Sequence, residues 1–207
     1  MRTRFSTNTG KKLEKANFRK LPKALYLAIM RKYFKQYPVL PWIPFSAIDH
    51  LNNLIKPNWK VLEIGSGMST LWLAKRSEKV ISIEADKNWF DKLGEMIYAR
   101  KFTNIDLRFE WEREKIADFS EFKDHEFDLI YIDGGPRELC CINAYAKLKN
   151  GGYIYFDNSD SSELCGNAVV LLKEYTQNSI NKIFEHVDLV PGNFMVNEGL
   201  LIQKPAN

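Results

Sequence analysis

The 207-residue sequence has few of the features that mark secreted or membrane-spanning proteins. Its three cysteines are Cys140, Cys141 and Cys165, and because two of them are adjacent they form neither a disulfide framework nor a metal-ligand spacing. The apolar run at residues 25–30 is far shorter than a membrane span, and no signal-peptide pattern opens the chain. We therefore expect a cytoplasmic protein with reduced thiols and no membrane span.

Acidic residues are almost missing from the first 40 positions, which carry eleven Lys or Arg and a single acid, Glu14. The rest of the chain has a net charge of −6, so a basic head precedes a mildly acidic body. We favour a solvated, partly disordered tail for this head. A contact surface for nucleic acid or another polyanion is an alternative. A targeting segment is disfavoured, because residues 22–37 have the pattern of a folded helix.

Hydrophobic content of 45% and charged content of 27% are ordinary for one globular domain with a substantial core. Short apolar runs alternate with helical patterns, and this alternation predicts an α/β fold with a mostly parallel sheet covered by helices on both faces. We expect helices at 22–37, 47–54, 87–100, 118–122, 136–148 and 168–176, and strands at 61–64, 80–83, 105–109, 127–132, 153–157, 182–190 and 199–203. The last two strands, joined by Pro191 and Gly192, should be antiparallel.

Side-chain patterns suggest how some of these helices begin and which faces they bury. Residues 25, 29 and 33 recur every four positions and predict an apolar face on the first helix. Ser46 should cap the second helix, and Asp86 the helix that follows the second strand. Trp72 and Trp89 lie at positions typical of a core.

A glycine turn at residues 65–67 is the strongest functional signal in the chain. Gly65 and Gly67 follow a buried strand and precede a helix, and they allow the main chain to approach a ligand closely. Ser69 or Thr70 can cap the helix, whose first N–H groups favour an anionic group. Glu84 ends the next strand at a spacing suited to ribose hydroxyls, so the turn predicts a site for a nucleoside-type cofactor.

Two residues near the turn distinguish between cofactors. The fingerprint for NAD requires a third glycine where this chain has Thr70. Glu63 brings negative charge to the turn, which suits the cationic sulfonium of S-adenosylmethionine. S-adenosylmethionine is thus the favoured cofactor, and an NAD-dependent oxidoreductase is a weaker alternative.

The motifs resemble those of the class I S-adenosylmethionine-dependent methyltransferases. Residues 63–67 are similar to the first motif of this family, 82–86 to the second, 127–134 to the fourth strand and 148–158 to the turn and fifth strand. The resemblance implies a Rossmann-like, doubly wound, mostly parallel sheet of seven strands with an antiparallel last strand. It also implies a division into a basic helical extension at 1–44, placed as a lid, and a catalytic domain at 45–207.

The same resemblance implies which residues form the site. Asp133 ends the fourth strand and is the candidate catalytic residue. The residues expected to bind the cofactor are Glu63, Gly65, Ser66, Gly67, Ser69, Thr70, Glu84, Trp111 and Asp133.

Asp133, Asp157 and Asn158 lie at the ends of two neighbouring strands, where their oxygens suit Mg²⁺. This pattern resembles the magnesium-dependent O-methyltransferases that act on catechols and caffeoyl thioesters. Those enzymes have a lysine base where this chain has Pro136. The following residue, Arg137, remains cationic and is expected to hold an anionic substrate instead.

The favoured function is O-methylation of a small polar or anionic acceptor, such as a metabolite or sugar. Residues 133–136 read Asp-Gly-Gly-Pro, which differs from the motif typical of enzymes that methylate nucleobases. An alternative from another class is a protein that keeps the cofactor fold and uses its basic head to bind RNA or another polyanion.

Overall fold

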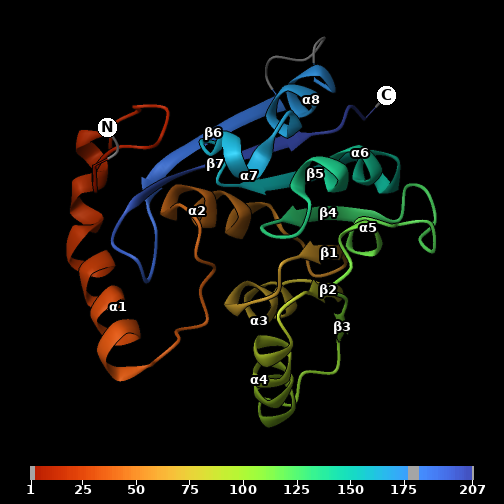
Figure 1. The fold of residues 1–207 in the computed structure, drawn as a ribbon, viewed down its shortest axis with the longest axis horizontal. Coiled ribbons are helices and arrows are strands. Elements are labelled where there is room, and N and C mark those ends of the chain that lie inside the picture. The colour runs from red at the N-terminus through yellow and green to blue at the C-terminus, as the bar shows by residue number, and fades with distance from the viewer. Residues whose placement is uncertain (1–2, 177–181, 207) are drawn as a thin grey trace.

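The computed structural model describes residues 3–176 and 182–206, which form one seven-stranded sheet with helices against both faces (Figure 1). The strand order is β3-β2-β1-β4-β5-β7-β6. The strands are β1 (Lys60–Ile64), β2 (Lys79–Glu84), β3 (Ile105–Phe109), β4 (Phe127–Ile132), β5 (Leu148–Asp157), β6 (Ile183–Leu189) and β7 (Val196–Gln203). The first five strands pair in parallel, and β7 is antiparallel to both β5 and β6. The predicted fold class is confirmed.

Side chains of the central strands alternate between two hydrophobic clusters. Leu62 and Ile64 pack toward α6 (Arg137–Lys147) and α8 (Ala168–Glu174), whereas Val61 packs toward α2 (Phe45–Leu54) and α3 (Met68–Ala74). Buried runs on both faces are typical of a parallel sheet enclosed by helices.

Parallel pairing brings the carboxyl ends of the central strands to one edge. Ile64 of β1 pairs with Ile83 of β2 and with Ile132 of β4, and Ile132 pairs with Phe156 of β5. The residues that follow these four positions are Gly65, Glu84, Asp133 and Asp157. The register therefore gathers the glycine turn and three carboxylates at the edge where ligands bind in such sheets.

The basic N-terminal segment is folded onto the body and is not the disordered tail that we favoured from the sequence. It contains a bridge between Ser6 and Lys12, a 3₁₀ helix η1 (Lys15–Lys20) and helix α1 (Leu21–Phe34). Lys11 pairs with Glu185 at 2.7 Å, and Lys20 pairs with the buried Asp188 at 2.6 Å. Residues 1–2 of the predicted extension lie outside the described part of the chain.

The structure differs from three local predictions for the first two helices. Helix α1 ends at Phe34, earlier than expected, because Lys35 adopts a left-handed conformation with φ of 51°. Its expected apolar stripe is exposed, and the helix buries Ala24 and Leu27 instead. The predicted cap by Ser46 is wrong, because α2 already begins at Phe45 and places Ser46 inside the helix.

Other helices match the sequence more closely. Asp86 caps α4 (Lys87–Ala99) as predicted, accepting the backbone N–H of Trp89 at 3.0 Å. Residues 118–122, where we expected a helix, are not helical. A single helical turn, α5 (Arg113–Ile116), lies just before them. Another short helix, α7 (Ser162–Cys165), follows β5. Among the described residues, no helix is long and apolar enough to cross a membrane.

Candidate functional site

The turn after β1 is shaped by contact with the end of β4. Gly65 has φ of +89°, and a Cβ there would lie 2.8 Å from the backbone nitrogen of Gly134. A Cβ on Gly134 would in turn lie 2.8 Å from the Cα of Gly65. Only glycine suits both the dihedral angle and the close approach. The two loops therefore touch, which holds Asp133 beside the turn.

A buried network supports the turn from beneath. The Glu63 carboxylate is inaccessible to solvent and accepts hydrogen bonds from the hydroxyls of Thr70 and Ser82, each at 2.5 Å. Thr70 also accepts the backbone N–H of Gly67 at 2.9 Å, and the Ser66 and Ser82 hydroxyls lie 2.6 Å apart. Burial raises the pKa of Glu63 to about 7.

Glu84, at the end of β2, is anchored by main-chain donors. Its two carboxylate oxygens accept the N–H groups of Ser66 at 3.0 Å, Ala85 at 2.9 Å and Asp86 at 2.8 Å. Burial raises the pKa of Glu84, and these N–H groups oppose that shift. Each carboxylate oxygen can accept more than one hydrogen bond, so the fixed carboxylate can still bind ligand hydroxyls.

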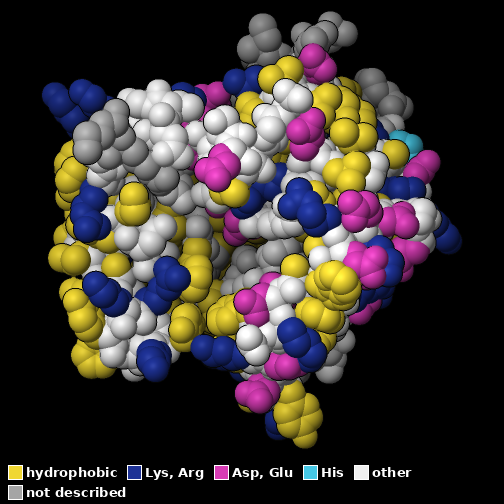
Figure 2. Space-filling view, viewed as in Figure 1, with side chains coloured by type: hydrophobic (Ala, Val, Ile, Leu, Met, Phe, Trp, Pro, Cys, Tyr) yellow, Lys and Arg dark blue, Asp and Glu magenta, His cyan; other side chains and the backbone are white. Residues whose placement is uncertain are grey.

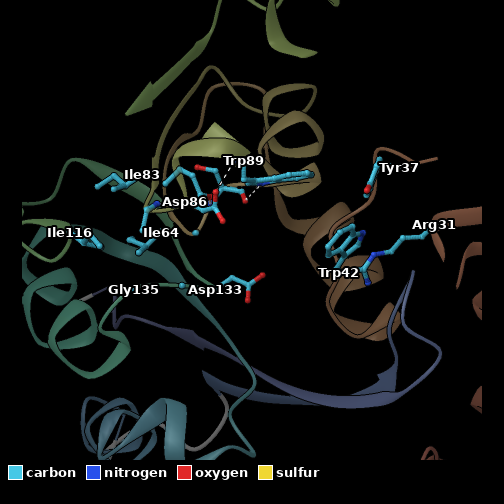
Figure 3. A pocket seen from close by; sticks show the side chains of 15 residues that line it. Arg31, Tyr37, Trp42, Ile64, Ile83, Asp86, Trp89, Ile116, Asp133 and Gly135 are labelled. Carbon is cyan, nitrogen blue, oxygen red and sulfur yellow. Dashed lines mark hydrogen bonds between the residues drawn. The ribbon is translucent and has the colours of Figure 1, made fainter. Parts of the chain in front are cut away.

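These groups face a cavity of 520 Å³, which we call the cofactor cavity. Its floor is formed by the carboxyl ends of β1, β2 and β4, and its opposite wall by Arg31, Tyr37 and Trp42 of the N-terminal segment. Figure 3 shows Asp133 on the sheet side of this cavity and Arg31 beside Trp42 across from it. Residues of the N-terminal segment thus form the wall opposite the sheet.

Four residues that line the cofactor cavity were missed by the sequence analysis. The Trp89 indole N–H donates to the carbonyl oxygen of Ser66 at 3.0 Å, and Trp89 lines the cavity. The prediction that Trp89 belongs to the core is therefore wrong. Tyr37 stacks against Trp42 with ring centroids 6.2 Å apart, and the Arg31 guanidinium lies 3.8 Å from the Trp42 ring. The one available signal was the aromatic residues flanking the proline-rich stretch.

The predicted cofactor residues fall into four groups. Four of them line the cofactor cavity: Gly65, Ser66, Glu84 and Asp133. Gly67 and Ser69 line a small adjoining cavity of 80 Å³, and Glu63 and Thr70 lie buried beneath the turn. Trp111 is 67% exposed and is not among the residues that line the cavity.

Asp133 also borders a second, more polar cavity of 430 Å³, which we call the polar cavity. Asp157 lines it too, and its carboxyl group accepts the Tyr155 hydroxyl at 3.0 Å. Asp157 is 2% exposed, whereas the Asp133 side chain is 27% exposed. Burial raises the pKa of both carboxyls, and the charge of Asp133 raises the pKa of Asp157 further. The upward shift of the pKa is larger for the more buried Asp157.

The expected magnesium ligands come together, but their arrangement does not fit the ion. The Arg137 Nη2 atom donates to Asp133 Oδ1 at 3.1 Å and to Asn158 Oδ1 at 3.3 Å. It also donates to the Asp133 carbonyl oxygen at 2.7 Å. A guanidinium thus already binds two of the side-chain oxygens that were expected to hold the metal. Among the described residues, no group of three His, Cys, Asp or Glu side chains could hold a metal ion.

The position of Arg137 also bears on its expected contact with substrate. The side chain is 7% exposed and is directed at the ends of β4 and β5. It lies outside the linings of the cofactor and polar cavities. Arg137 therefore joins the two strand ends, and Arg31 is the arginine that faces both cavities.

Comparison with known proteins agrees with this geometry. Residues 62–159, slightly under half of the chain, match a family model described as a methyltransferase domain. A curated relative, the probable ribosomal RNA small subunit methyltransferase A of Methanosphaera stadtmanae, is 46% identical over 55 residues. That match covers 26% of this chain and 20% of the relative, so it spans about a fifth of the relative's length.

Two solved structures show the same fold. The O-methyltransferase TomG from Streptomyces achromogenes, solved with S-adenosylmethionine, is 16% identical with a TM-score of 0.60, and the match covers 94% of this chain and 91% of TomG. Spermidine synthase from Thermotoga maritima is 19% identical with a TM-score of 0.52, and the match covers 74% of this chain and 56% of the synthase. At these identities the likeness concerns the fold alone.

The buried Glu63 predicts a pH-dependent stability. Its pKa of about 7 exceeds the value of 4.5 expected for an unfolded chain, so the folded state binds more protons between these two values. The free energy of unfolding therefore falls as pH rises from about 4.5 through 7, by roughly 3 kcal/mol at most. Glu63→Gln should flatten this fall and melt at a higher temperature than the wild type at pH 8.

Thermal melts at pH 5 and pH 8 measure this difference. Glu121→Gln makes the same change on a side chain that is 58% exposed and should leave the wild-type dependence intact. Equal pH dependence of melting in the wild type and Glu63→Gln would contradict the assignment.

The arginine at the strand ends predicts how the protein responds to magnesium. The wild-type melting temperature should be the same in MgCl₂ and in EDTA. Arg137→Ala should lower it, because Asp133 and Asn158 lose their cationic partner, and Mg²⁺ should restore part of the loss. Arg137→Lys keeps a cation there and should not respond to Mg²⁺. Stabilisation of the wild type by Mg²⁺ would show that the guanidinium does not replace a metal.

Proposed function

We propose that this chain, a class I S-adenosylmethionine-dependent methyltransferase, transfers the methyl group to a hydroxyl oxygen of a small polar acceptor bound in the polar cavity. One observation carries this proposal: Asp133 lines both the cofactor cavity and the polar cavity. A donor in the first and an acceptor in the second would meet at this carboxylate.

The cofactor cavity suits S-adenosylmethionine in charge and shape. Glu84 is fixed by three main-chain N–H groups and can accept the ribose hydroxyls. Glu63 places a buried carboxyl beneath the turn, where a sulfonium cation favours its ionised form. Ile64, Ile83 and Ile116 provide apolar surface in the same cavity for the adenine ring.

The polar cavity suits a hydroxylated acceptor. Its lining includes amide, hydroxyl and carboxyl side chains, among them Asn8, Asn158, Asp160 and Ser161. Such groups bind hydroxyls by paired donor and acceptor contacts. Trp42 adds an aromatic surface at the border with the cofactor cavity. A sugar or another small polyhydroxylated metabolite fits this lining.

The reaction requires alignment and the removal of one proton. The acceptor oxygen attacks the methyl carbon as the carbon–sulfur bond breaks, and the bonding electrons leave with sulfur. Asp133 accepts the proton of the attacking hydroxyl. Arg137 holds the Asp133 carboxylate through Oδ1, and the proton on Asp157 leaves Asp133 as the ionised member of the pair. No metal takes part in these steps.

The N-terminal extension, residues 1–44, acts as the lid of this site, over a catalytic domain at 45–207. Arg31 and Trp42 line both cavities, and Asn8 lines the polar cavity. The backbone N–H of Asn8 donates to Asp160 Oδ2 at 2.7 Å, which joins the lid to the acceptor side. A location in the cytoplasm stays a prediction from the sequence.

The binding of RNA or another polyanion by the N-terminal segment is a second candidate. The 55-residue match to a ribosomal RNA methyltransferase favours it. Against it, Lys11 and Lys20 are already paired with acidic residues of the body. Transfer to RNA should weaken steeply with salt, whereas transfer to a small hydroxylated acceptor should not.

Asp133→Asn tests the proposed chemistry. Release of S-adenosylhomocysteine is measured against a panel of sugars, phenols and total RNA at two salt concentrations. With the acceptor that the wild type uses, the variant should bind S-adenosylmethionine within a few-fold of the wild type but transfer methyl groups about 100-fold more slowly or worse.

Asp106→Asn, on β3, is the matched control, because Asp106 pairs with Arg108 away from the cavities. It should keep full activity. Undiminished transfer by Asp133→Asn would exclude Asp133 as the base, and methylation confined to RNA at low salt would favour the second candidate.

A further inference from the structure

A third cavity, of 670 Å³, lies between α1 and the loop at residues 192–194. We call it the α1 groove. Its α1 side is formed by Leu25, Ala28, Ile29 and Tyr33, and Phe194 lies on the loop side. Leu25 is 46% exposed, Ile29 39% and Tyr33 69%. The apolar stripe that the sequence predicts for α1 therefore lines a groove and does not pack into the core.

The charges around the α1 groove are of one sign. Arg4, Arg31 and Lys32 line it, and no Asp or Glu is among the described residues of its lining. Helix α1 itself contains three basic residues and no acid. Figure 2 shows basic and hydrophobic side chains gathered on this side of the molecule, where α1 lies in Figure 1. A ligand that fits this lining combines apolar surface with negative charge.

The α1 groove adjoins the site already described. Tyr37 and Arg31 line both the groove and the cofactor cavity, and Arg31 and Asn193 line both the groove and the polar cavity. The Arg31 guanidinium donates to the carbonyl oxygen of Gly192 at 3.2 Å while it stacks on Trp42. Arg31 therefore stands where the three cavities meet, within reach of a ligand that extends from one into another.

We propose that the α1 groove binds the non-reacting part of the methyl acceptor, and that this part is an apolar chain or ring carrying a phosphate or carboxylate. The inference rests on the proposed function, since the acceptor's hydroxyl lies in the polar cavity. Leu25 and Ile29 contact the apolar part, and Arg31 and Lys32 pair with the anionic group. The substrate is thus a single amphiphilic small molecule with a polar reacting end.

Two observations favour this occupant over a macromolecule. Three aliphatic and three aromatic side chains together line the groove, and they offer a continuous apolar surface that an alkyl chain or a ring can occupy. The groove is also concave and shares Arg31 with the two other cavities. A concave lining suits a small ligand better than a macromolecule that spreads over a surface. A membrane surface is distinguished from a single amphiphile in the test below.

Decyl phosphate, used below its micelle concentration, is the probe. Its binding is measured by calorimetry and by the fluorescence of nearby Trp42. The binding of S-adenosylmethionine is measured in a separate titration of the same protein. Decyl phosphate should bind at least tenfold more tightly than inorganic phosphate or the uncharged decyl maltoside, because each comparison probe lacks one of the two required features.

Matched variants on α1 locate the probe. Ile29→Glu should weaken decyl phosphate binding at least tenfold, whereas Tyr26→Glu should change it less than twofold. Tyr26 lies on the same helix and is 59% exposed but does not line the groove. Lys32 lines the groove, and Lys32→Glu should weaken decyl phosphate binding to a similar extent. Lys23 lies outside the lining, as Tyr26 does, and Lys23→Glu should leave binding unchanged. All four changes are at exposed positions, so each variant should fold.

The outcomes separate this inference from the proposed function. If S-adenosylmethionine binds but decyl phosphate does not, or if Tyr26→Glu weakens the probe as much as Ile29→Glu does, the α1 groove is not the acceptor site. If the protein binds vesicles of anionic phospholipid but not monomeric decyl phosphate, α1 contacts a membrane surface and the inference is wrong. Failure to bind S-adenosylmethionine contradicts the proposed function, whatever the probe does.

Discussion

The contact between Gly65 and Gly134 is the constraint on which the site depends. It occurs because β1 and β4 pair in parallel with Ile64 opposite Ile132, so their following loops leave the sheet side by side. The backbone N–H of Asp133 donates to the Ile64 carbonyl at 2.9 Å, and the N–H of Gly65 donates to the Ile83 carbonyl at the same distance. The turn, the end of β2 and the backbone of Asp133 are therefore fixed by main-chain geometry.

Charge distribution explains how the N-terminal segment is held against the body. The body concentrates carboxylates at the carboxyl ends of its strands and along β6 and β7, whereas the N-terminal segment is strongly basic. Lys11 and Lys20 use part of this charge in ion pairs with the body. The pair of Lys20 with the buried Asp188 resists separation, because removal of Lys20 would leave an isolated buried charge. Arg31 then lies over the cavities and not in solvent.

The features that the sequence could predict are those set by short stretches of chain. The strand ending at Ile64, the glycine turn, the acid at Glu84 and the Asp86 cap all depend on neighbouring residues and are observed. The seven strands and the antiparallel last strand followed from the family resemblance. The gathering of Asp133 with Asp157 followed from their places at the ends of two neighbouring parallel strands. Together these predicted the fold and the sheet side of the site.

The errors arise where distant parts of the chain compete for the same side chains. Ser46 does not cap α2 because Phe45 joins the helix and is buried against the body. Trp89 has the helical spacing of a core residue, yet its indole N–H binds the turn.

The metal site and the apolar face of α1 show the same limit. The spacing of Asp133, Asp157 and Asn158 matches a magnesium site, but the pattern cannot show that Arg137 binds two of their oxygens. The apolar stripe of α1 has the periodicity of a packed face, although the body leaves it exposed. Sequence periodicity identifies a face but not its partner.

The central claim is that the cofactor cavity binds S-adenosylmethionine through Glu84, and calorimetric titration of the purified chain tests it most directly. We expect one S-adenosylmethionine per chain, no heat from NAD at the same concentrations, and a loss of affinity of at least tenfold in Glu84→Ala. An absence of heat with millimolar S-adenosylmethionine and with S-adenosylhomocysteine, in material shown to be folded, would contradict the account.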